Sequence, residues 1–385
     1  MRIGVDIRSL SAGGHSGVEE YIFNLLPNLF RLGREDQFVL LYNSYSRALP
    51  EKVKKWEKLP NVSIKGFKIP SKLLNGLLWQ FNFPYLDKLI GGVDVFFSPN
   101  ITFTAVSVGT PHVITIHDLS FELFPHFFNY YRRLWHFLVN PRRQAKKATK
   151  VITVSKSTMS DVNELYRIKK SKIRPIYLGL SSIFQNYTKN EKKEEKIRKK
   201  YKIPAKPFIL YLGTLEPRKN IASLLLAFNE WKKSSKENYT LVIAGTKGWS
   251  FQEIFQLSEE SPYKKDIVFT GELQEKDRPA IYKMASLFVF PSFLEGFGFP
   301  PLEALSSGVP VICSASTSLL EIFGDHSILV NPHDAGELAW TIGRVLGDQA
   351  IQASLIKEGE KYAKKFTWEK TARETLEVLR EAGGE

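Results

Sequence analysis

The sequence predicts an α/β protein in which two domains each contain a parallel sheet flanked by helices. The chain has 385 residues, enough for two domains that each bury a core. Short apolar segments alternate with longer segments of helical pattern along the whole chain, which is typical of parallel sheets with helices on both faces. A polar, highly charged stretch over 186–202 separates two sets of these segments.

The apolar segments predict five strands in each domain. Those of the N-terminal domain are Ile3–Ile7, Phe38–Tyr42, Val93–Phe97, His112–His117 and Val151–Val154. Those of the C-terminal domain are Phe208–Leu212, Leu241–Ala244, Ile267–Phe269, Leu287–Phe290 and Val309–Cys313. We expect the domains to cover 1–185 and 186–365, followed by a helix within 366–385 that has helical spacing over Trp368–Arg380. The charged stretch predicts an exposed helix or linker.

Composition indicates a soluble protein in a reducing compartment. The single cysteine, Cys313, excludes disulfides within the chain. No apolar stretch reaches the roughly 18 residues of a membrane span. The segment Met1–Asp6 reads as a first strand rather than a signal peptide. We therefore expect a cytoplasmic protein.

The net charge of +14 is concentrated in the first half of the chain. Residues 1–200 contain 33 Lys and Arg against 16 Asp and Glu, whereas residues 201–385 contain 21 against 24. The excess is densest over 130–150, where cations are interleaved with aromatic residues. This segment fits a solvated helix face with core aromatics, or a surface for an anionic acceptor or the anionic inner face of a cell membrane. No motif accompanies it that would indicate nucleic-acid binding.

The most informative segment is Pro291–Pro310, which reads PSFLEGFGFPPLEALSSGVP. Glu295 and Glu303 lie eight residues apart around a Gly-Phe-Gly turn that follows a predicted strand. Because proline is tolerated at the first helical position, we expect a helix that begins at Pro300 or Pro301, with Glu303 in its first turn. Its backbone N–H groups and dipole would favour an anion. Flanking carboxylates suit a ligand with phosphate at one end and hydroxyls at the other, such as a nucleotide sugar.

A second anion site is predicted over Gly213–Asn220, between a predicted strand and the helical pattern Ile221–Trp231. Arg218 and Lys219 lie where the helix begins, and Asn220 is its candidate N-cap. Two cations beside a helix N-terminus suit a diphosphate. By itself the motif also fits an exposed basic turn.

Other glycine-containing loops follow predicted strands, at the sheet edge where ligands bind in open α/β folds. Gly245, Lys247 and Leu273 could contact a base and ribose, although glycine after a strand is common in any such fold. The loop with Gly14 and Gly17 leads into a helix, where backbone can approach a phosphate. Its spacing differs from G-x-G-x-x-G, and the chain lacks G-x-x-x-x-G-K-[ST], which disfavours dinucleotide binding and kinase-type ATP use.

His117 and Asp118 end a predicted buried strand. A lone histidine there is usually structural, whereas a His-Asp pair at a strand end also suits hydrogen bonding to a substrate hydroxyl. The seven histidines are scattered and no Asp-x-Asp occurs, so we expect no metal ion and no other cofactor. Arg218 and Lys219 would then stabilise a diphosphate leaving group in place of a metal.

Together these motifs resemble the retaining glycosyltransferases of the GT-B fold in the large group 1 family, which includes bacterial mannosyltransferases and sucrose synthase-like enzymes. Glu295-x7-Glu303 carries the resemblance, which extends over nearly the whole chain. It implies two Rossmann-like domains facing an interdomain cleft, a donor held mainly by the C-terminal domain, and a last helix that crosses back to the N-terminal domain. Many members have an arginine where this chain has Thr214, which leaves the division of labour between Arg218 and Lys219 open.

The resemblance also implies roles for the site residues. Glu295 would contact the donor sugar, Glu303 the ribose hydroxyls, and His117 the sugar near the reaction centre. Arg218 and Lys219 would bind the diphosphate. The other donor-binding residues that it implies are Gly14, Gly17, Gly213, Thr214, Gly245, Lys247, Leu273, Gly296, Phe297, Gly298 and Phe299.

The expected activity is metal-independent transfer of a hexose from a nucleotide diphosphate donor to an acceptor hydroxyl, with retention. The acceptor would be a lipid-linked or polysaccharide precursor of cell-envelope glycan. No carboxylate pair is placed as in glycosidases, which suits the same-face mechanism usually proposed for this family. The Gly213–Asn220 segment resembles that of bacterial surface-polysaccharide mannosyltransferases and favours GDP-mannose, with UDP-sugars open. A nucleotide-sugar epimerase or phosphorylase of the same architecture, or a non-catalytic nucleotide-sugar-binding protein, remains an alternative.

Overall fold

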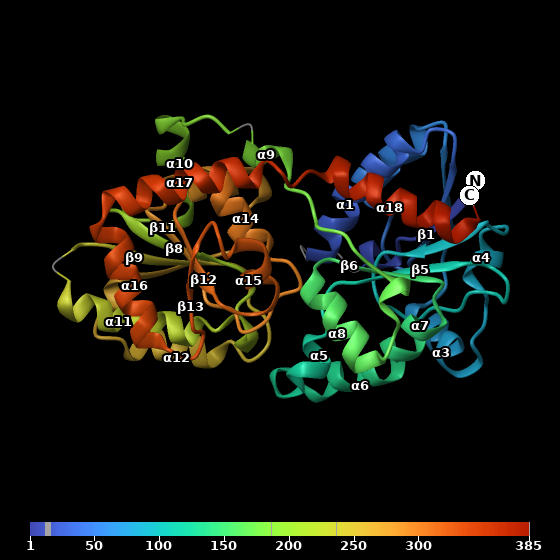
Figure 1. Ribbon diagram of the computed structural model, residues 1–385, viewed down its shortest axis with the longest axis horizontal. Coiled ribbons are helices and arrows are strands. Elements are labelled where there is room, and N and C mark those ends of the chain that lie inside the picture. Colours follow the sequence, from blue (N-terminus) through green and yellow to red (C-terminus); the bar gives the residue numbers. More distant parts are fainter. Residues whose placement is uncertain (12–16, 186, 236, 385) are drawn as a thin grey trace. The chain divides into compact units, whose positions relative to one another are not determined.

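The computed structural model describes residues 1–11, 17–185, 187–235 and 237–384 (Figure 1). It divides into two compact units. Unit 1 comprises Met1–Gly179 and Thr367–Glu385, and unit 2 comprises Leu180–Phe366. The chain leaves unit 1 after Gly179, a few residues before the boundary at 185 that the sequence predicts. It returns to unit 1 at Thr367 for the last helix.

Unit 1 contains a seven-stranded parallel sheet with strand order β3-β2-β1-β4-β5-β6-β7. Its strands are β1 (Arg2–Asp6), β2 (Gln37–Asn43), β3 (Val62–Phe67), β4 (Val95–Ser98), β5 (His112–Ile116), β6 (Lys150–Thr153) and β7 (Ile173–Pro175). The strand order reverses between β1 and β4. Ligands of open α/β sheets bind outside the carboxyl ends of strands at such a reversal.

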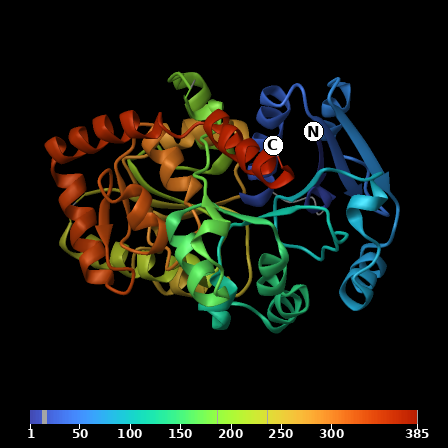
Figure 2. The ribbon, with the colours of Figure 1, turned by 45° about the vertical axis from the view of Figure 1, so that its right-hand side comes forward.

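The helices of unit 1 cover this sheet and include the C-terminal helix. They are α1 (Gly17–Leu32), α2 (Glu51–Lys54), α3 (Ser71–Phe81), α4 (Leu86–Leu89), α5 (Ser120–Leu123), α6 (Tyr130–Val139), α7 (Pro141–Lys147), α8 (Lys156–Tyr166) and α18 (Trp368–Gly383). Helix α18 packs on α1, and Arg380 forms an ion pair of 2.9 Å with the buried Asp36. Both chain ends therefore lie together in unit 1 (Figure 2).

Unit 2 contains a six-stranded parallel sheet with strand order β10-β9-β8-β11-β12-β13. Its strands are β8 (Phe208–Leu212), β9 (Thr240–Ala244), β10 (Ile267–Gly271), β11 (Leu287–Phe290), β12 (Val311–Ser314) and β13 (Ile328–Val330). The order reverses between β8 and β11, so the carboxyl ends of these two strands are neighbours. That edge is where a ligand of unit 2 is expected.

The α-helices of unit 2 are α9 (Ser182–Gln185), α10 (Glu191–Tyr201), α11 (Ile221–Ser234), α12 (Gln252–Glu260), α13 (Arg278–Met284), α14 (Phe299–Ser306), α15 (Thr317–Phe323), α16 (Ala335–Gly347) and α17 (Gln349–Ala363). The charged stretch of the sequence forms α10, which buries only one side, including Ile197 and Tyr201. Short 3₁₀ helices occur at Arg8–Ser11, Lys55–Lys58, Pro125–Phe127, Lys170–Lys172, Pro217–Lys219, Lys264–Asp266 and Glu275–Asp277.

Each of the ten predicted strands is present, with ends shifted by no more than two residues. The structure also contains three strands that the sequence analysis does not predict: β3, β7 and β13. All three lie at sheet edges and are only partly buried. An edge strand carries exposed polar positions, so it lacks the continuous apolar run of a central parallel strand.

Candidate active site

The loops that follow β8 and β11 are fixed to each other where the strand order reverses in unit 2. The side-chain amide of Asn220 donates to the backbone carbonyl of Pro291, after β11, at 3.0 Å and to that of Pro332, after β13, at 2.7 Å. The backbone N–H of Phe293 donates to the carbonyl of Arg218 at 3.0 Å. The loop with the predicted cations and the loop with the first glutamate therefore form one rigid strand-end assembly.

Asn220 occupies the N-cap position of α11, as predicted. Its side chain, however, accepts no hydrogen bond from a backbone N–H of the first turn. Its backbone is left-handed, with φ of 56°, and its Oδ1 accepts instead from the Ser223 hydroxyl at 2.7 Å. The side chain ties strand ends together, which a residue facing only its own helix could not do.

Four charged side chains form a largely buried cluster between these loops, here called the charge cluster: Glu216, Arg218, Lys219 and Glu295. Lys219 Nζ lies 2.7 Å from Oε1 of Glu295, and Arg218 Nη1 lies 3.4 Å from its Oε2. Arg218 also contacts Glu216, whose Oε1 lies 2.9 Å from Nη2 and 3.1 Å from Nε. The four side chains are between 4% and 13% exposed. The cluster holds two cations and two carboxylates at one strand-end edge.

Neighbouring groups fix both the arginine and the backbone of Glu295. Arg218 Nη1 donates to the backbone carbonyl of Leu294 at 2.8 Å. The backbone N–H of Glu295 donates to Thr317 Oγ1 at 3.2 Å, and the Ser318 hydroxyl donates to its carbonyl at 2.8 Å. Thr317 and Ser318 begin α15, so this helix start holds the loop between the two glutamates.

The Glu295 carboxyl is ionised in this setting. Burial disfavours its charged form, but the charges of Lys219 and Arg218 and the hydrogen bond from Lys219 outweigh burial and hold its pKa below the usual value. A carboxylate this buried depends on its cationic partners, because an unpaired buried charge is costly. The cluster is thus internally neutralised when no ligand is present.

Glu303 lies deeper, on α14, and is 1% exposed. Its Oε1 lies 3.1 Å from Nη1 of Arg278, and its Oε2 accepts from the Tyr282 hydroxyl at 2.8 Å. The prediction that it lies in the first turn is wrong: Gly298, with φ of 103°, ends the loop so that α14 begins at Phe299. Glu303 is therefore the fifth residue of the helix and is held by α13.

The other predicted donor residues of unit 2 follow four neighbouring strands. Gly213 and Thr214 follow β8, Gly245 and Lys247 follow β9, Leu273 follows β10, and Gly296, Phe297, Gly298 and Phe299 follow β11. Gly245 packs directly on Gly213: its φ is 146°, and a Cβ would lie 1.8 Å from the Gly213 carbonyl oxygen. Leu273 is buried, whereas Lys247 is exposed and lies over the Phe251 ring at 5.1 Å.

His117 follows β5 in unit 1. Its Nε2 lies 2.9 Å from the carbonyl oxygen of Pro99, and its ring meets that of Tyr21 edge-on at 4.9 Å. Burial lowers the pKa of His117, and the bond to Pro99 offsets part of this effect. Because a carbonyl only accepts, Nε2 carries the proton of the neutral ring, and Nδ1 remains an acceptor for a hydroxyl.

Two further predicted residues come from the glycine-containing segment near the start of the sequence. Gly17 is the exposed first residue of α1, and Gly14 lies outside the described residues.

Asp118, next to His117, accepts from the backbone N–H and the hydroxyl of Ser120 at 2.9 and 2.6 Å. The aspartate therefore fixes the turn that leads into α5.

Sequence reasoning missed the residues that hold the site residues in place: Glu216, Arg278, Tyr282, Thr317 and Ser318. Glu216 lies within the predicted diphosphate loop, where an acid beside two cations was an available signal. The other four come from α13 and α15, and nothing in their local sequence connects them to the glutamates. Only the fold brings them together.

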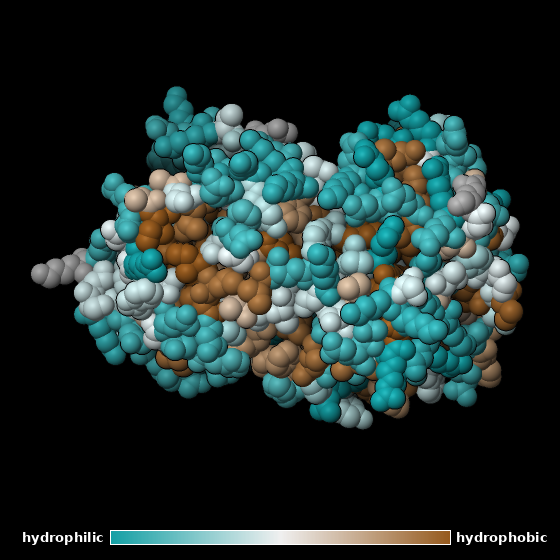
Figure 3. Space-filling model, in the orientation of Figure 1, coloured by the Kyte–Doolittle hydropathy of each residue, from teal (hydrophilic) through white to brown (hydrophobic). Residues whose placement is uncertain are grey.

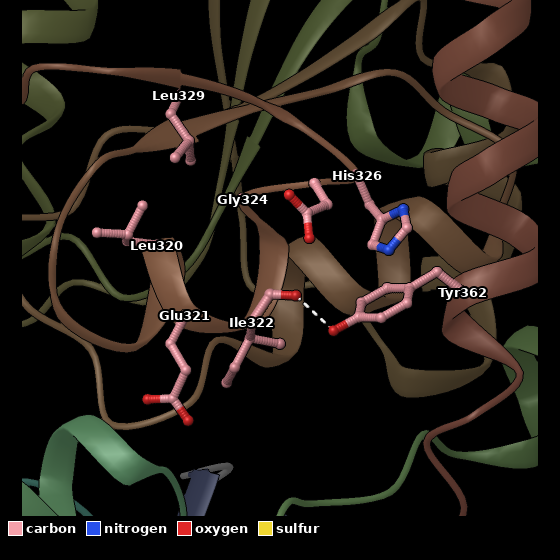
Figure 4. Close-up of a pocket in the computed structure, with 8 residues that line it drawn as sticks. Leu320, Glu321, Ile322, Gly324, His326, Leu329 and Tyr362 are labelled. Atoms are coloured by element: carbon pink, nitrogen blue, oxygen red, sulfur yellow. Dashed lines mark hydrogen bonds between the residues drawn. The ribbon is translucent and has the colours of Figure 1, made fainter.

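A separate pocket of about 240 Å³ lies at the far end of α15 from the charge cluster (Figure 4). The Tyr362 hydroxyl donates to the Ile322 carbonyl at 2.6 Å, and its ring stacks on His326 at 3.8 Å. Glu321 and Asp325 also line the pocket, but no lysine or arginine does. The two lining carboxylates therefore disfavour an anionic donor there.

Neither a metal-binding cluster nor a membrane-spanning helix occurs among the described residues. No group of three or more His, Cys, Asp or Glu side chains in them is arranged to hold a metal ion. None of their helices combines the length and apolar character needed to span a membrane.

Comparisons with known proteins cover both units. Residues 193–362 match the family model "Glycosyl transferases group 1", and residues 15–182 match the model "Glycosyltransferase Family 4". The first match contains the whole charge cluster and Glu303. The second contains His117.

Similar proteins include two mannosyltransferases of Escherichia coli. The chain is 32% identical to O-antigen chain mannosyltransferase B over 269 residues, which are 70% of each chain. It is 30% identical to the serotype-specific mannosyltransferase WbdA over 243 residues, which are 63% of this chain and 30% of that longer protein. The chain thus spans most of the first relative and about a third of the second.

The fold is also that of solved structures. Anabaena HepE, crystallised with UDP and glucose, superimposes with a TM-score of 0.72 over 99% of this chain and 100% of its own, at 18% identity. Two parallel-sheet, Rossmann-like units with reversed strand order form the GT-B architecture that the sequence predicts. The family models and the relative matched over 70% of both chains lead to one conclusion: the chain belongs to the group 1 glycosyltransferases and is a glycosyltransferase with the GT-B fold.

Proposed function

We propose that the protein is a retaining mannosyltransferase that transfers mannose from a nucleotide diphosphate donor to a hydroxyl of a glycan acceptor. The observation that carries the proposal is the charge cluster, which places Arg218, Lys219 and Glu295 together at the strand-order reversal of unit 2. The similarity to an O-antigen chain mannosyltransferase and to a serotype-specific mannosyltransferase supports mannose and a surface-glycan acceptor. We favour GDP-mannose over UDP-sugars as the donor.

Lys219 and Arg218 would stabilise the departing diphosphate, together with the N-termini of α11 and α14. In this reaction the bond between the anomeric carbon and the phosphate oxygen breaks, and the acceptor oxygen bonds to that carbon on the same face. The acceptor proton passes to the departing phosphate oxygen. Glu295 would bind the sugar hydroxyls. In unit 1, Nδ1 of His117 would accept from a substrate hydroxyl.

Glu303 would bind the ribose hydroxyls. Its two oxygens each contact one group of α13, and a carboxylate has about four lone-pair positions. Arg278 and Tyr282 would thus fix the carboxylate while leaving it capacity to accept from a ribose.

A nucleotide-release screen tests this function. Purified protein is incubated with GDP-mannose, GDP-fucose, UDP-glucose and UDP-N-acetylglucosamine, with and without mannosylated lipid-linked acceptors. We expect release of GDP from GDP-mannose that depends on acceptor, and an α-linked product by NMR. Conversion of a donor without acceptor would indicate an epimerase, dependence on phosphate a phosphorylase, and donor binding without release a non-catalytic protein.

We further propose that α6 and α7 of unit 1 bind an anionic membrane that carries a lipid-linked acceptor. Tyr130, Leu134 and Phe137 recur at helical spacing on α6 and are 71%, 39% and 77% exposed, so they are not core residues. The same two helices carry exposed cations: Arg132, Arg133, Arg142, Arg143, Lys146 and Lys147. Figure 3 shows hydrophobic side chains beside strongly hydrophilic ones at the surface of this part of unit 1. Apolar side chains among cations suit an anionic lipid surface.

Replacing Tyr130 and Phe137 by alanine together is expected to reduce binding to vesicles that contain anionic phospholipid by at least about fivefold, because apolar insertion adds to charge attraction. Co-sedimentation at low salt measures this binding. Trp340→Ala is the matched control, since that side chain is 64% exposed but lies on α16 of unit 2. Absence of wild-type binding to such vesicles would contradict the membrane proposal.

A further inference from the structure

We propose that Glu295 competes with the donor diphosphate for Lys219 and exchanges this cation for sugar hydroxyls when a nucleotide sugar binds, so that the site discriminates nucleotide sugar from free nucleoside diphosphate. The inference rests on the proposed function, which places diphosphate and sugar at these residues. It goes beyond that function because it assigns Glu295 a second role before the donor arrives. Glu295 would be a specificity determinant as well as a sugar ligand.

The charge balance of the cluster requires such an exchange. Without ligand, the carboxylates of Glu216 and Glu295 neutralise the charges of Arg218 and Lys219. The carboxylate oxygens lie 2.7 to 3.4 Å from the cationic nitrogens. A nucleotide sugar brings two negative charges on its diphosphate. Placing these beside an internally neutralised, largely buried cluster would gain little attraction and would remove the diphosphate from water at high cost. At least one carboxylate must therefore give up its cation.

The contacts identify Glu295 as the carboxylate that moves. Glu216 is 4% exposed and receives two N–H groups of Arg218, while Arg218 is also bonded to the Leu294 carbonyl. Separating that pair would break several hydrogen bonds at once. Glu295 instead meets Lys219 through one contact of 2.7 Å and Arg218 through a longer one of 3.4 Å. A lysine ammonium is a compact point charge that can change partner without loss of geometry.

Only the side chain of Glu295 has to rotate. Its backbone N–H and carbonyl are bonded to Thr317 and Ser318 at the start of α15, so the loop stays in place. Lys219 lies over the Phe290 ring at 5.3 Å, which keeps the ammonium near the strand end when the carboxylate leaves. The depressed pKa of Glu295 agrees with a charged side chain that must find new hydrogen-bond donors.

The hydroxyls of the sugar supply the hydrogen-bond donors that Glu295 needs, and these donors are absent when no sugar is bound. With a nucleotide sugar bound, the hydroxyls compensate the carboxylate for the loss of Lys219. With a nucleoside diphosphate alone, no hydroxyl is present, and Glu295 returns to Lys219 in competition with the phosphates. The product nucleotide is thereby held less tightly than the donor, which favours its release after transfer.

Calorimetric titration of GDP and GDP-mannose tests the exchange with wild-type protein and Glu295→Gln, a variant of equal size without the charge. We expect Glu295→Gln to bind GDP about fivefold more tightly or better, because Lys219 loses its competitor. The preference for GDP-mannose over GDP should fall in the same variant. Weaker GDP binding by Glu295→Gln would overturn the inference, since it would mean that Glu295 merely positions Lys219.

Glu216→Gln is the matched control, with the same chemical change on the other carboxylate of the cluster. Because Glu216 holds Arg218, its loss should weaken GDP binding, opposite in sign to Glu295→Gln. Tighter GDP binding by both variants would indicate a general charge effect and would also overturn the inference. Absence of binding by wild-type protein to GDP, GDP-mannose, UDP and UDP-glucose would contradict the proposed function itself. Equal thermal stability of the three proteins establishes that each is folded.

Discussion

Replacing Lys219 by alanine is expected to lower turnover more than about tenfold, because a cation that neutralises a departing diphosphate acts mainly in the transition state. Lys219 lies at the strand-order reversal of unit 2 and is 12% exposed. Its loss also leaves Glu295 without its 2.7 Å partner. Initial rates of nucleotide release at saturating donor and acceptor measure the effect, and Glu295→Ala is expected to lower turnover by a similar factor.

The control for Lys219→Ala is Lys199→Ala, on α10. Lys199 is 75% exposed and pairs with Glu195 on the same helix, so its loss should leave turnover near the wild-type rate. Turnover near wild type in both Lys219→Ala and Glu295→Ala would show that the assignment of the site is wrong. Lys219→Arg retains the charge and separates the loss of a cation from the loss of the lysine shape.

Replacing Gly245 by alanine is expected to lower the free energy of unfolding by about 3 kcal/mol or more, through backbone strain and overpacking together. The new Cβ would lie 1.8 Å from the Gly213 carbonyl oxygen, and the residue has φ of 146°. Neither the backbone of Gly213 nor that of Gly245 can move without separating the loops after β8 and β9. Urea unfolding measures the loss.

Gly271→Ala is the matched control at the end of the next strand. Gly271 also has positive φ, at 69°, but a Cβ there meets no atom within 4 Å. Its replacement should cost only about 1 kcal/mol, the penalty of left-handed backbone for an L-residue. Equal losses in the two variants would contradict the close approach of the β8 and β9 loops.

Prediction of the fold from sequence succeeded where a strand is buried on both faces. The central strands β8, β9 and β11 are continuous apolar runs and were located almost to the residue. The edge strands β3 and β7 were missed because solvent-facing positions interrupt their pattern. Register and strand order depend on contacts between distant segments, and these contacts cannot be predicted from a local sequence pattern.

The candidate site shows the same division. Arg218, Lys219, Glu295 and Glu303 can be proposed from sequence because charged residues next to glycine turns at strand ends are visible in one stretch of sequence. Their partners were not visible, since Glu303 is held by α13 and Glu295 by α15. The mutual neutralisation of the cations and carboxylates was also hidden, because Glu295 lies 76 residues from Lys219 in the chain.

The sequence by itself determined the α/β class, the ten inner and edge strands with strong apolar runs, and the resemblance to group 1 glycosyltransferases. These properties depend on local pattern: burial on both faces selects apolar runs, and tight turns select glycine. The tertiary structure decided which charges meet. Strand order brings the carboxyl ends of β8 and β11 together, and burial there forces each carboxylate to take a cation as its partner.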